Sequence, residues 1–241
     1  MPSRPLLVAY FPVADPLIPD SMLDYYANVG VDVVELGLKA TNPSYDGDVI
    51  TRTMRRAVGS GHVSDALGTA SYLRRLPGKP KGVLFCYPEA AILEADQEWS
   101  GIDGVLCLPT DPEKQAIVAA KAQARGTRRV EFVGYDWDLE DSKRARKADE
   151  YVMLQYSQGR TGIRDEIDNR LADRLSRLRD EGVEVPIVTG IGISTHDQLR
   201  HALDAGADGI VIGSKAVELA EESGEALATY LGGMRGILDG G

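Results

Sequence analysis

Short apolar runs alternate with longer amphipathic stretches along the whole chain. The apolar runs are rich in Val, Ile and Leu and hardly alternate with polar residues, which is typical of strands that helices cover on both faces. Eight of these runs are predicted to be strands: 6–11, 32–37, 82–86, 103–107, 129–135, 150–156, 185–190 and 208–213. Because helical spacing follows each run, the pattern predicts a parallel sheet built from βα units.

Capping residues and glycines mark where several helices begin and end. The stretch after Asp111 has a proline in its first turn and runs to Gly126, which is typical of a helix with an aspartate N-cap. Another helix is predicted to begin after Ser194 or Thr195. A further helical stretch at 64–76 is predicted to be an insertion between the second and third units. One more helix is predicted from apolar residues at helical spacing: Ile167, Leu171, Leu175 and Leu178.

Eight such units within 241 residues predict a single (β/α)8 barrel of the TIM type. No linker rich in Pro, Gly or Ser divides the chain, so residues 1–241 are expected to form one domain. A doubly wound open sheet is the alternative topology. In a barrel the chemistry lies at the carboxyl ends of the strands and in the loops that follow them, so functional residues are expected there.

The composition narrows the range of partners. The net charge of −10 argues against a nucleic acid or an anionic membrane as the main partner, although backbone amides can still hold a small anion. Cys86 and Cys107 make no disulfide framework, no apolar stretch has membrane-spanning length, and the first residues lack a signal-peptide pattern. A cytoplasmic protein is therefore expected. No metal-ligand spacing and no dinucleotide fingerprint occur, so neither a metal nor a cofactor is predicted.

Two acidic residues lie close to the end of the second predicted strand. Glu35 stands inside the apolar run 32–37, where an ionised, unpaired carboxylate is costly. It is either paired with a lysine or arginine, or it is a catalytic acid with a raised pKa. Asp46 comes in the following loop, just before Gly47, and is either a helix N-cap or a second functional carboxylate.

Glycines follow the sixth, seventh and eighth predicted strands. In segment 158–164, QGRTGIR, Thr161 and Gly162 belong either to a loop whose amides close on a ligand or to a plain turn. Segments 189–194, TGIGIS, and 212–216, IGSKA, follow strands seven and eight. Loops in these two positions commonly bind phosphate, because glycine allows close backbone approach and the next helix presents free N–H groups. The pair of loops therefore predicts a phosphorylated small-molecule ligand.

Taken together, these motifs resemble the alpha subunit family of tryptophan synthase. The resemblance covers most of the chain and rests on the segments YFPVADP, VVELG, NPSYDGDVI, GIDGVLCLP, GRTG, GIGIS and DGIVIGS. Its most specific part is the glutamate of the second strand combined with the Asp-Gly of the next loop. The family cleaves indole-3-glycerol phosphate to indole and glyceraldehyde 3-phosphate by a retro-aldol reaction without a cofactor. The resemblance implies this reaction, or that of a close analogue.

The resemblance also implies a role for each candidate residue. Glu35 matches the general acid–base that protonates the indole carbon and helps to remove the hydroxyl proton, and Asp46 matches the residue that hydrogen-bonds the indole N–H. Thr161 belongs to the loop expected to close on the ligand. The phosphate is expected at Gly162, Gly192, Ile193, Gly213 and Ser214. The indole ring is expected in an apolar slot lined by Tyr10, Leu84, Leu106, Tyr151, Ile191 and Val211.

The chain departs from the family's usual sequence at several positions. Residues 39–42, Lys-Ala-Thr-Asn, stand where the family usually has Pro-Phe-Ser-Asp, and Asp48 replaces a proline. Met153 replaces a tyrosine of the strand-six pocket, and Pro109 aligns with an aspartate. The CYPEA stretch at 86–90 replaces one that contains an asparagine, and the helix that normally precedes the first strand is missing.

These departures change the surface that meets the beta subunit in the family, whereas the catalytic and phosphate positions are kept. The resemblance therefore predicts a lyase that releases indole by itself, or one that pairs with a different beta-like subunit. A barrel aldolase or isomerase acting on another phosphorylated substrate is a second hypothesis. A non-catalytic subunit that activates a partner is a third. Glu35 and Asp46 argue against the third, because a binding-only protein has no need of a buried strand acid.

Overall fold

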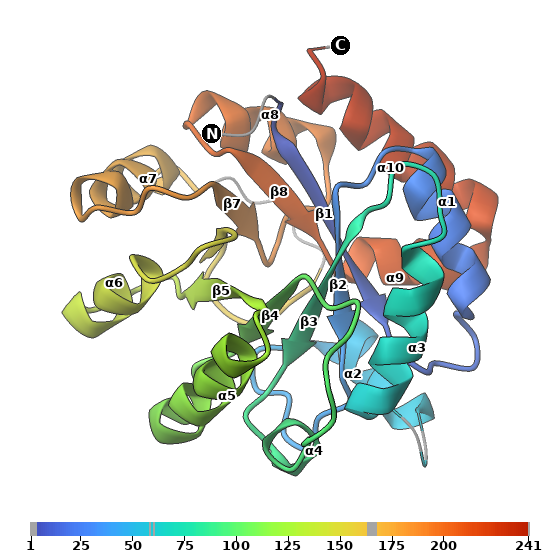
Figure 1. Ribbon diagram of the computed structural model, residues 1–241. Coiled ribbons are helices and arrows are strands. Elements are labelled where there is room, and N and C mark those ends of the chain that lie inside the picture. Colours follow the sequence, from blue (N-terminus) through green and yellow to red (C-terminus); the bar gives the residue numbers. More distant parts are fainter. Residues whose placement is uncertain (1–3, 58, 60, 163–167, 241) are drawn as a thin grey trace.

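Eight parallel strands form a closed barrel in which each strand pairs with the next along the chain and β8 pairs with β1 (Figure 1). This computed structural model describes residues 4–57, 59, 61–162 and 168–240. The strands are β1 (Leu6–Pro12), β2 (Val33–Gly37), β3 (Lys81–Cys86), β4 (Gly104–Cys107), β5 (Arg128–Val133), β6 (Val152–Gln155), β7 (Ile187–Gly190) and β8 (Gly209–Ile212). The predicted (β/α)8 barrel is confirmed, and the open-sheet alternative is wrong.

Helices surround the barrel on its outer side (Figure 1). They are the 3-10 helix η1 (Asp20–Met22) and the α-helices α1 (Leu23–Asn28), α2 (Asp48–Arg56), α3 (Val63–Leu73), α4 (Ala90–Leu93), α5 (Pro112–Ala124), α6 (Leu139–Ala145), α7 (Leu171–Asp180), α8 (His196–Asp204), α9 (Ser214–Glu222) and α10 (Gly224–Leu238). In α7 the predicted apolar positions Leu171, Leu175 and Leu178 are buried, as helical spacing requires. Ile167, predicted on the same face, lies outside the described residues.

Side-chain caps fix where two of these helices begin. The Asp111 carboxylate accepts a hydrogen bond from the Lys114 N–H at 3.1 Å, at the start of α5. At the start of α8 the Thr195 hydroxyl accepts one from the Gln198 N–H at 3.2 Å, so Thr195 rather than Ser194 is the N-cap. Each cap satisfies an N–H that has no partner within its own helix.

The extra helix of the second unit is α2, and not the stretch 64–76. α3 packs against β2 and β3 and so takes the place of the outer helix, whereas α2 contacts β1 and α9. The prediction of an insertion at 64–76 is therefore wrong. The reason is the face that each helix offers: α3 buries apolar residues from Val63 to Leu73 along its whole length, while α2 buries only Ile50 and Met54 as apolar side chains.

The strand register decides which side chains point the same way. Tyr10, Glu35 and Val83 occupy aligned positions on β1, β2 and β3. Aligned residues of neighbouring strands share one side of a sheet, and successive residues of one strand alternate between the two sides. Glu35 therefore points to the same side of the barrel wall as Tyr10, and both side chains are buried.

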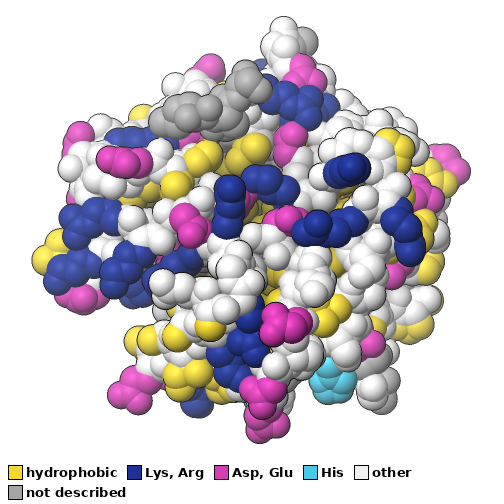
Figure 2. Space-filling model, in the orientation of Figure 1, with side chains coloured by type: hydrophobic (Ala, Val, Ile, Leu, Met, Phe, Trp, Pro, Cys, Tyr) yellow, Lys and Arg dark blue, Asp and Glu magenta, His cyan; other side chains and the backbone are white. Residues whose placement is uncertain are grey.

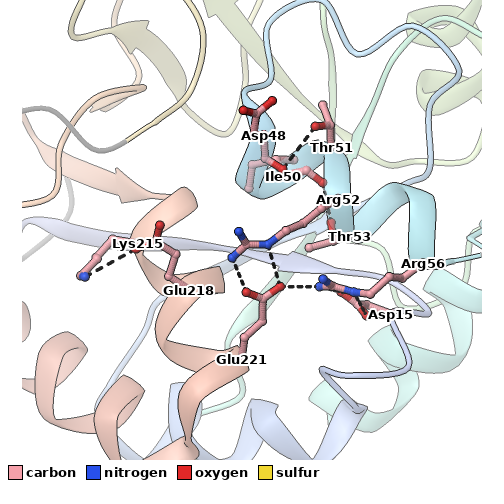
Figure 3. Close-up of polar contacts among 10 residues, drawn as sticks. All are labelled: Asp15, Asp48, Ile50, Thr51, Arg52, Thr53, Arg56, Lys215, Glu218 and Glu221. Carbon is pink, nitrogen blue, oxygen red and sulfur yellow. Dashed lines mark hydrogen bonds and ion pairs between the residues drawn. The ribbon is translucent and has the colours of Figure 1, made fainter.

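An ion-pair cluster joins α2 to α9 and to the segment after β1 (Figure 3). The Arg56 guanidinium donates from Nε to Asp15 Oδ1 at 2.8 Å and from Nη2 to Glu221 Oε1 at 2.6 Å. Arg52 Nε donates to the same oxygen of Glu221 at 3.0 Å. The Asp15 side chain is fully buried, so Arg56 compensates a charge that water does not reach. Because α2 and α9 follow the loops after β2 and β8, the cluster holds these two loops together.

The surface carries both signs of charge despite the net charge of −10. In Figure 2, lysine and arginine side chains gather at the left of the view, where α6 and α7 lie in Figure 1, and acidic side chains stand out near the edges. Within the part of the chain that the structure describes, no helix has both the length and the apolar character needed to cross a membrane.

Replacing Arg56 with Met is expected to lower the free energy of unfolding by about 2–4 kcal/mol, because the Asp15 carboxylate then stays buried without its guanidinium. Urea denaturation followed by circular dichroism measures the change. Arg55→Met is the matched control, since Arg55 is an exposed neighbour on the same helix. Equal urea midpoints for the two variants would contradict the structural role of the cluster.

Candidate functional site

A cavity opens at the carboxyl ends of the strands, the end at which barrel enzymes carry their active sites. It encloses about 540 Å³ of space, part of which is open to solvent. Among the described residues of its lining, two carboxylates and one lysine are charged, and most of the others are apolar or glycine. An apolar cavity with a few convergent polar groups is the usual form of a small-molecule site.

Glu35 projects from β2 into this cavity and is almost fully buried, with 1% of its surface exposed. The Tyr151 hydroxyl, one residue before β6, donates a hydrogen bond to Glu35 Oε1 at 2.7 Å. Burial raises the pKa of Glu35 to about 7, although the hydrogen bond from Tyr151 opposes the rise. Within the described ranges no lysine or arginine pairs with this carboxylate, which removes the alternative of a buried ion pair.

Asp46 is the second buried carboxylate of the cavity. The Tyr87 hydroxyl donates to Oδ2 at 2.8 Å, and the Thr161 hydroxyl donates to Oδ1 at 3.3 Å. Burial raises the pKa of Asp46 to about 6, and both hydrogen bonds oppose the rise. Asp46 is not the helix cap that the sequence left open, because Gly47 occupies the N-cap position of α2.

The loop that carries Asp46 is fastened to the loop after β6. The Gly47 N–H donates to Thr161 Oγ1 at 2.8 Å, and the Thr161 N–H donates to the Tyr45 carbonyl oxygen at 2.8 Å. A β-carbon on Gly47 would stand 2.2 Å from the Thr161 carbonyl oxygen, so only glycine lets the two loops approach this closely. Segments more than a hundred residues apart in sequence therefore build one wall of the cavity.

Backbone after β7 and β8 forms another wall. Ile191 has a φ of +63°, a strained conformation for a β-branched residue and one that is found chiefly at functional sites. A β-carbon on Gly213, the N-cap of α9, would meet nothing within 4 Å, so this backbone borders open space. Ser214 is 6% exposed, and its Oγ has no hydrogen-bond partner among the described residues. A helix start with a free hydroxyl suits an anion such as phosphate.

Most of the residues that the sequence assigns to one site line this single cavity. They are Tyr10, Glu35, Asp46, Thr161, Gly162, Ile191, Gly192, Ile193, Val211, Gly213 and Ser214. They come from strands or loops of five of the eight βα units, which only the closed barrel brings together.

Leu84, Leu106 and Tyr151 do not line the cavity, so their assignment to the indole slot needs correction. Leu84 points outward, because its neighbour Phe85 lines the cavity and successive strand residues alternate. Leu106 is aligned with Phe85 and faces inward, but it lies one layer deeper than Leu108, which does reach the cavity. Tyr151 also lies deeper and reaches the site only through its hydrogen bond to Glu35.

Sequence reasoning misses several lining residues, namely Tyr45, Ile50, Phe85, Leu108 and Lys215, and it names Met153 only as a departure from the family. To find Phe85 and Leu108, one must know which residues of a strand point inward and in which layer of the barrel they lie. Uniformly apolar runs do not reveal either. Lys215 stands in the IGSKA segment beside a predicted phosphate residue, so its charge was the signal that could have marked it.

Within the described ranges, no group of three or more His, Cys, Asp or Glu residues stands where it could hold a metal ion. Cys86 and Cys107 are free, buried and aligned on β3 and β4.

Comparison with known proteins matches the chain to one family. The family model described as tryptophan synthase alpha chain matches residues 1–232. The tryptophan synthase alpha chain of Geobacter sulfurreducens is 30% identical over an alignment of 247 positions, which covers 97% of this chain and 93% of the relative. The tryptophan synthase alpha chain of Opitutus terrae is 28% identical over an alignment of 252 positions, which covers 99% of this chain and 94% of the relative.

Solved structures agree on the fold. A structure of Mycobacterium tuberculosis tryptophan synthase matches with a TM-score of 0.83 and 21% identity, over 97% of this chain and 92% of that one. Tryptophan synthase subunit alpha from Legionella pneumophila matches with a TM-score of 0.78 and 20% identity, over 98% and 93%. At these identities the structural likeness establishes the shared fold.

Tyr10→Phe is expected to raise the free energy of unfolding by about 1 kcal/mol, because the buried Tyr10 hydroxyl has no hydrogen-bond partner among the described residues. Tyr26→Phe is a control with the opposite sign, since the Tyr26 hydroxyl donates to the Tyr10 carbonyl oxygen at 2.9 Å and its loss costs about 1 kcal/mol. Urea denaturation measures both changes. A loss of stability in Tyr10→Phe would show that its hydroxyl is satisfied after all.

Proposed function

The chain belongs to the tryptophan synthase alpha chain family, and on this premise we propose that it is a carbon–carbon lyase that cleaves indole-3-glycerol phosphate to indole and glyceraldehyde 3-phosphate. The observation that carries the proposal is the pair of buried carboxylates, Glu35 and Asp46, in one apolar cavity. The same cavity contains a helix start whose serine hydroxyl has no hydrogen-bond partner among the described residues. An aromatic ring, an N–H group and a phosphate are the features of the substrate that match such a cavity.

The proposed reaction needs one proton added and one removed. The indole carbon C3 gains a proton, and the bond between C3 and the carbinol carbon of the side chain then breaks. Its electron pair returns to the ring, while the carbinol hydroxyl loses its proton and becomes the aldehyde of glyceraldehyde 3-phosphate. Nothing is oxidised or reduced overall, so positioned acid–base groups are sufficient for the chemistry.

Glu35 suits the role of general acid–base. A pKa of about 7 leaves both the protonated and the ionised carboxyl populated at neutral pH, so one group can give a proton to C3 and accept the proton of the hydroxyl. Tyr151 holds Oε1 by its hydrogen bond, so the proton is exchanged through Oε2. The apolar surroundings that raise the pKa also keep bulk water from competing for that proton.

Asp46 suits the role of anchor for the indole N–H. Its pKa, about 6, is lower than that of Glu35, so Asp46 is mainly ionised at pH 7. An ionised carboxylate accepts the N–H hydrogen bond and stabilises the positive charge that the ring acquires when C3 is protonated. Tyr87 and Thr161 keep the carboxylate in one orientation. The two acids thus divide the work by their environments.

Two alternatives share parts of this site. A barrel aldolase with another phosphorylated substrate would keep the same phosphate end, and Met153, an adaptable side chain in the cavity wall, is the residue that would accommodate a different group. A non-catalytic activating subunit would have no use for Glu35, whose burial in the charged form is costly. Release of free indole distinguishes the lyase from both alternatives.

We further propose that this lyase works without a beta subunit. In the family the loop after the second strand contacts the beta subunit, which orders the loop and switches the reaction on. Here Glu89 accepts hydrogen bonds from the N–H groups of Thr41 and Asn42 at 2.7 and 3.0 Å, and the Tyr87 hydroxyl accepts one from the Tyr45 N–H at 3.1 Å. Bonds within the chain thus hold the loop that carries Asp46. A beta-like partner with a matched surface is the alternative.

Glu35→Gln is expected to lower kcat by about 10²–10⁴-fold, because glutamine keeps the size of the side chain but cannot exchange a proton. Asp46→Asn is expected to lose comparably, since a neutral amide does not stabilise positive charge on the ring. Indole release from indole-3-glycerol phosphate by the purified chain measures both. Near-full activity of either variant would remove that residue from the mechanism.

The pH dependence gives a second test of the same acids. kcat/KM is expected to fall below about pH 6, where Asp46 gains a proton, and above about pH 7, where Glu35 loses the proton it donates. Glu35→Gln should also stabilise the protein by about 3 kcal/mol at pH 8, because the native carboxyl ionises at a higher pH than the unfolded one and so weakens the fold as pH rises. The stability gain separates loss of chemistry from loss of fold.

The purified chain is expected to release indole alone, with little stimulation by an excess of an ordinary tryptophan synthase beta subunit. Glu89→Ala should lower the rate of the isolated chain by about tenfold, because the amides of Thr41 and Asn42 lose their carboxylate and the loop of Asp46 loosens. Glu94→Ala, an exposed residue nearby, is the control. Slow release alone combined with strong stimulation by the beta subunit would contradict the stand-alone proposal.

A further inference from the structure

Lys215 is the one cationic side chain among the described residues that line the cavity. It is the second residue of α9, directly after Ser214. Figure 3 shows it at the start of this helix, apart from the ion-pair cluster that joins α2 to α9. Its amine lies beside Glu218, further along the helix, and rotation of the flexible side chain would bring it over the free N–H groups of the first turn.

A cation at this position is electrostatically unfavourable by itself. The N-terminus of a helix carries a partial positive charge, so acidic residues are preferred in the first turn and lysine is disfavoured. The first turn of α9 contains no acidic residue to offset the charge. An anion placed between the helix start and Lys215 is attracted by both. A bound anion therefore turns the unfavourable placement of Lys215 at a helix N-terminus into a favourable one.

Glu218 holds Lys215 only loosely. Lys215 Nζ lies 3.6 Å from Glu218 Oε2, one helical turn further along α9 (Figure 3). The two side chains are 31% and 32% exposed. A partly exposed ion pair at this separation contributes little to stability. Exchange of Glu218 for a ligand oxygen therefore costs little free energy.

We propose that Lys215 binds the phosphate of the substrate and makes the site selective for a dianion over an uncharged group, with Glu218 competing for the same amine. This inference rests on the proposed function, since it concerns recognition at the same site. The buried Ser214 hydroxyl, which has no hydrogen-bond partner among the described residues, independently indicates a polar ligand group at this end. Amides and a hydroxyl fix the geometry of the anion, and Lys215 adds the full charge that these neutral donors lack.

The charge of Lys215 also offsets an unfavourable interaction between the substrate and the acids of the cavity. Glu35 and Asp46 line the same space, and an ionised Asp46 repels a phosphate dianion through an apolar medium that screens weakly. A lysine at the phosphate end offsets that repulsion and favours the orientation in which the indole ring, and not the phosphate, lies beside the carboxylates.

Binding of glycerol 3-phosphate, which carries the phosphate but no indole, tests the proposal by isothermal titration calorimetry. Lys215→Gln is expected to weaken binding about tenfold at low ionic strength. The difference from the wild-type protein should shrink as salt is added, because salt screens a partly exposed charge. Lys215→Arg should retain most of the affinity, and Glu218→Gln should tighten binding by removing the competitor.

Lys143→Gln is the matched control for the change in net charge. Lys143 also pairs with a glutamate at i,i+3 spacing, Glu140 of α6, and it does not line the cavity. It should bind glycerol 3-phosphate as the wild-type protein does. If Lys143→Gln weakens binding as much as Lys215→Gln, the effect is one of overall charge and the proposal is overturned.

The remaining outcomes separate this inference from the proposed function. Equal affinities of the wild-type protein and Lys215→Gln at every salt concentration would overturn the role of Lys215 and leave the lyase proposal standing. Absence of glycerol 3-phosphate binding in the wild-type protein would overturn the role of Lys215, whereas absence of indole release would overturn the lyase proposal. In the indole-release assay, Lys215→Gln should raise KM for indole-3-glycerol phosphate and leave kcat nearly unchanged, and a lowered kcat with unchanged KM would contradict a binding role.

Discussion

Desolvation of the Glu35 carboxylate is the constraint on which the rest of the site depends. β2 is buried along its whole length, so an acid that points into the barrel has no water to stabilise its charge. One hydroxyl, from Tyr151, is the compensation that the described structure supplies. The proton affinity of Glu35 is therefore set by the architecture of the barrel, and a residue that is ordinarily ionised retains a proton near neutral pH.

Asp46 shows how the same barrel treats an acid on a loop. Its two hydroxyl donors come from different units, Tyr87 after β3 and Thr161 after β6. The orientation of this carboxylate depends on three loops meeting above the barrel, and the close approach at Gly47 is part of that meeting. The strands of the barrel thus position Glu35, whereas contacts among the loops position Asp46.

The amino-acid sequence was sufficient for the features that depend on local pattern. Uniformly apolar runs separated by amphipathic ones indicated eight strands and their helices, and an acid within such a run marked Glu35. The sequence pattern did not predict which side chains of a strand point inward, or which segments distant in sequence contact each other. A strand buried on both faces has no alternation to show whether Leu84 or Phe85 points inward. The stretch 64–76 does have an apolar face along its length, but its packing on β2 and β3, rather than that of α2, is a contact between elements that the sequence pattern does not show directly.

The Glu89 carboxylate, which accepts hydrogen bonds from the N–H groups of Thr41 and Asn42, connects two segments that lie far apart in the sequence. Residues 39–42 and 86–90 belong to different βα loops, yet each supplies what the other needs. Thr41 and Asn42 are exposed, so water can replace either partner, and the two hydrogen bonds act by fixing the conformation of the loop. A chimaera that grafts only one of the two segments onto a relative's barrel would therefore lose the hydrogen bonds that connect these two loops.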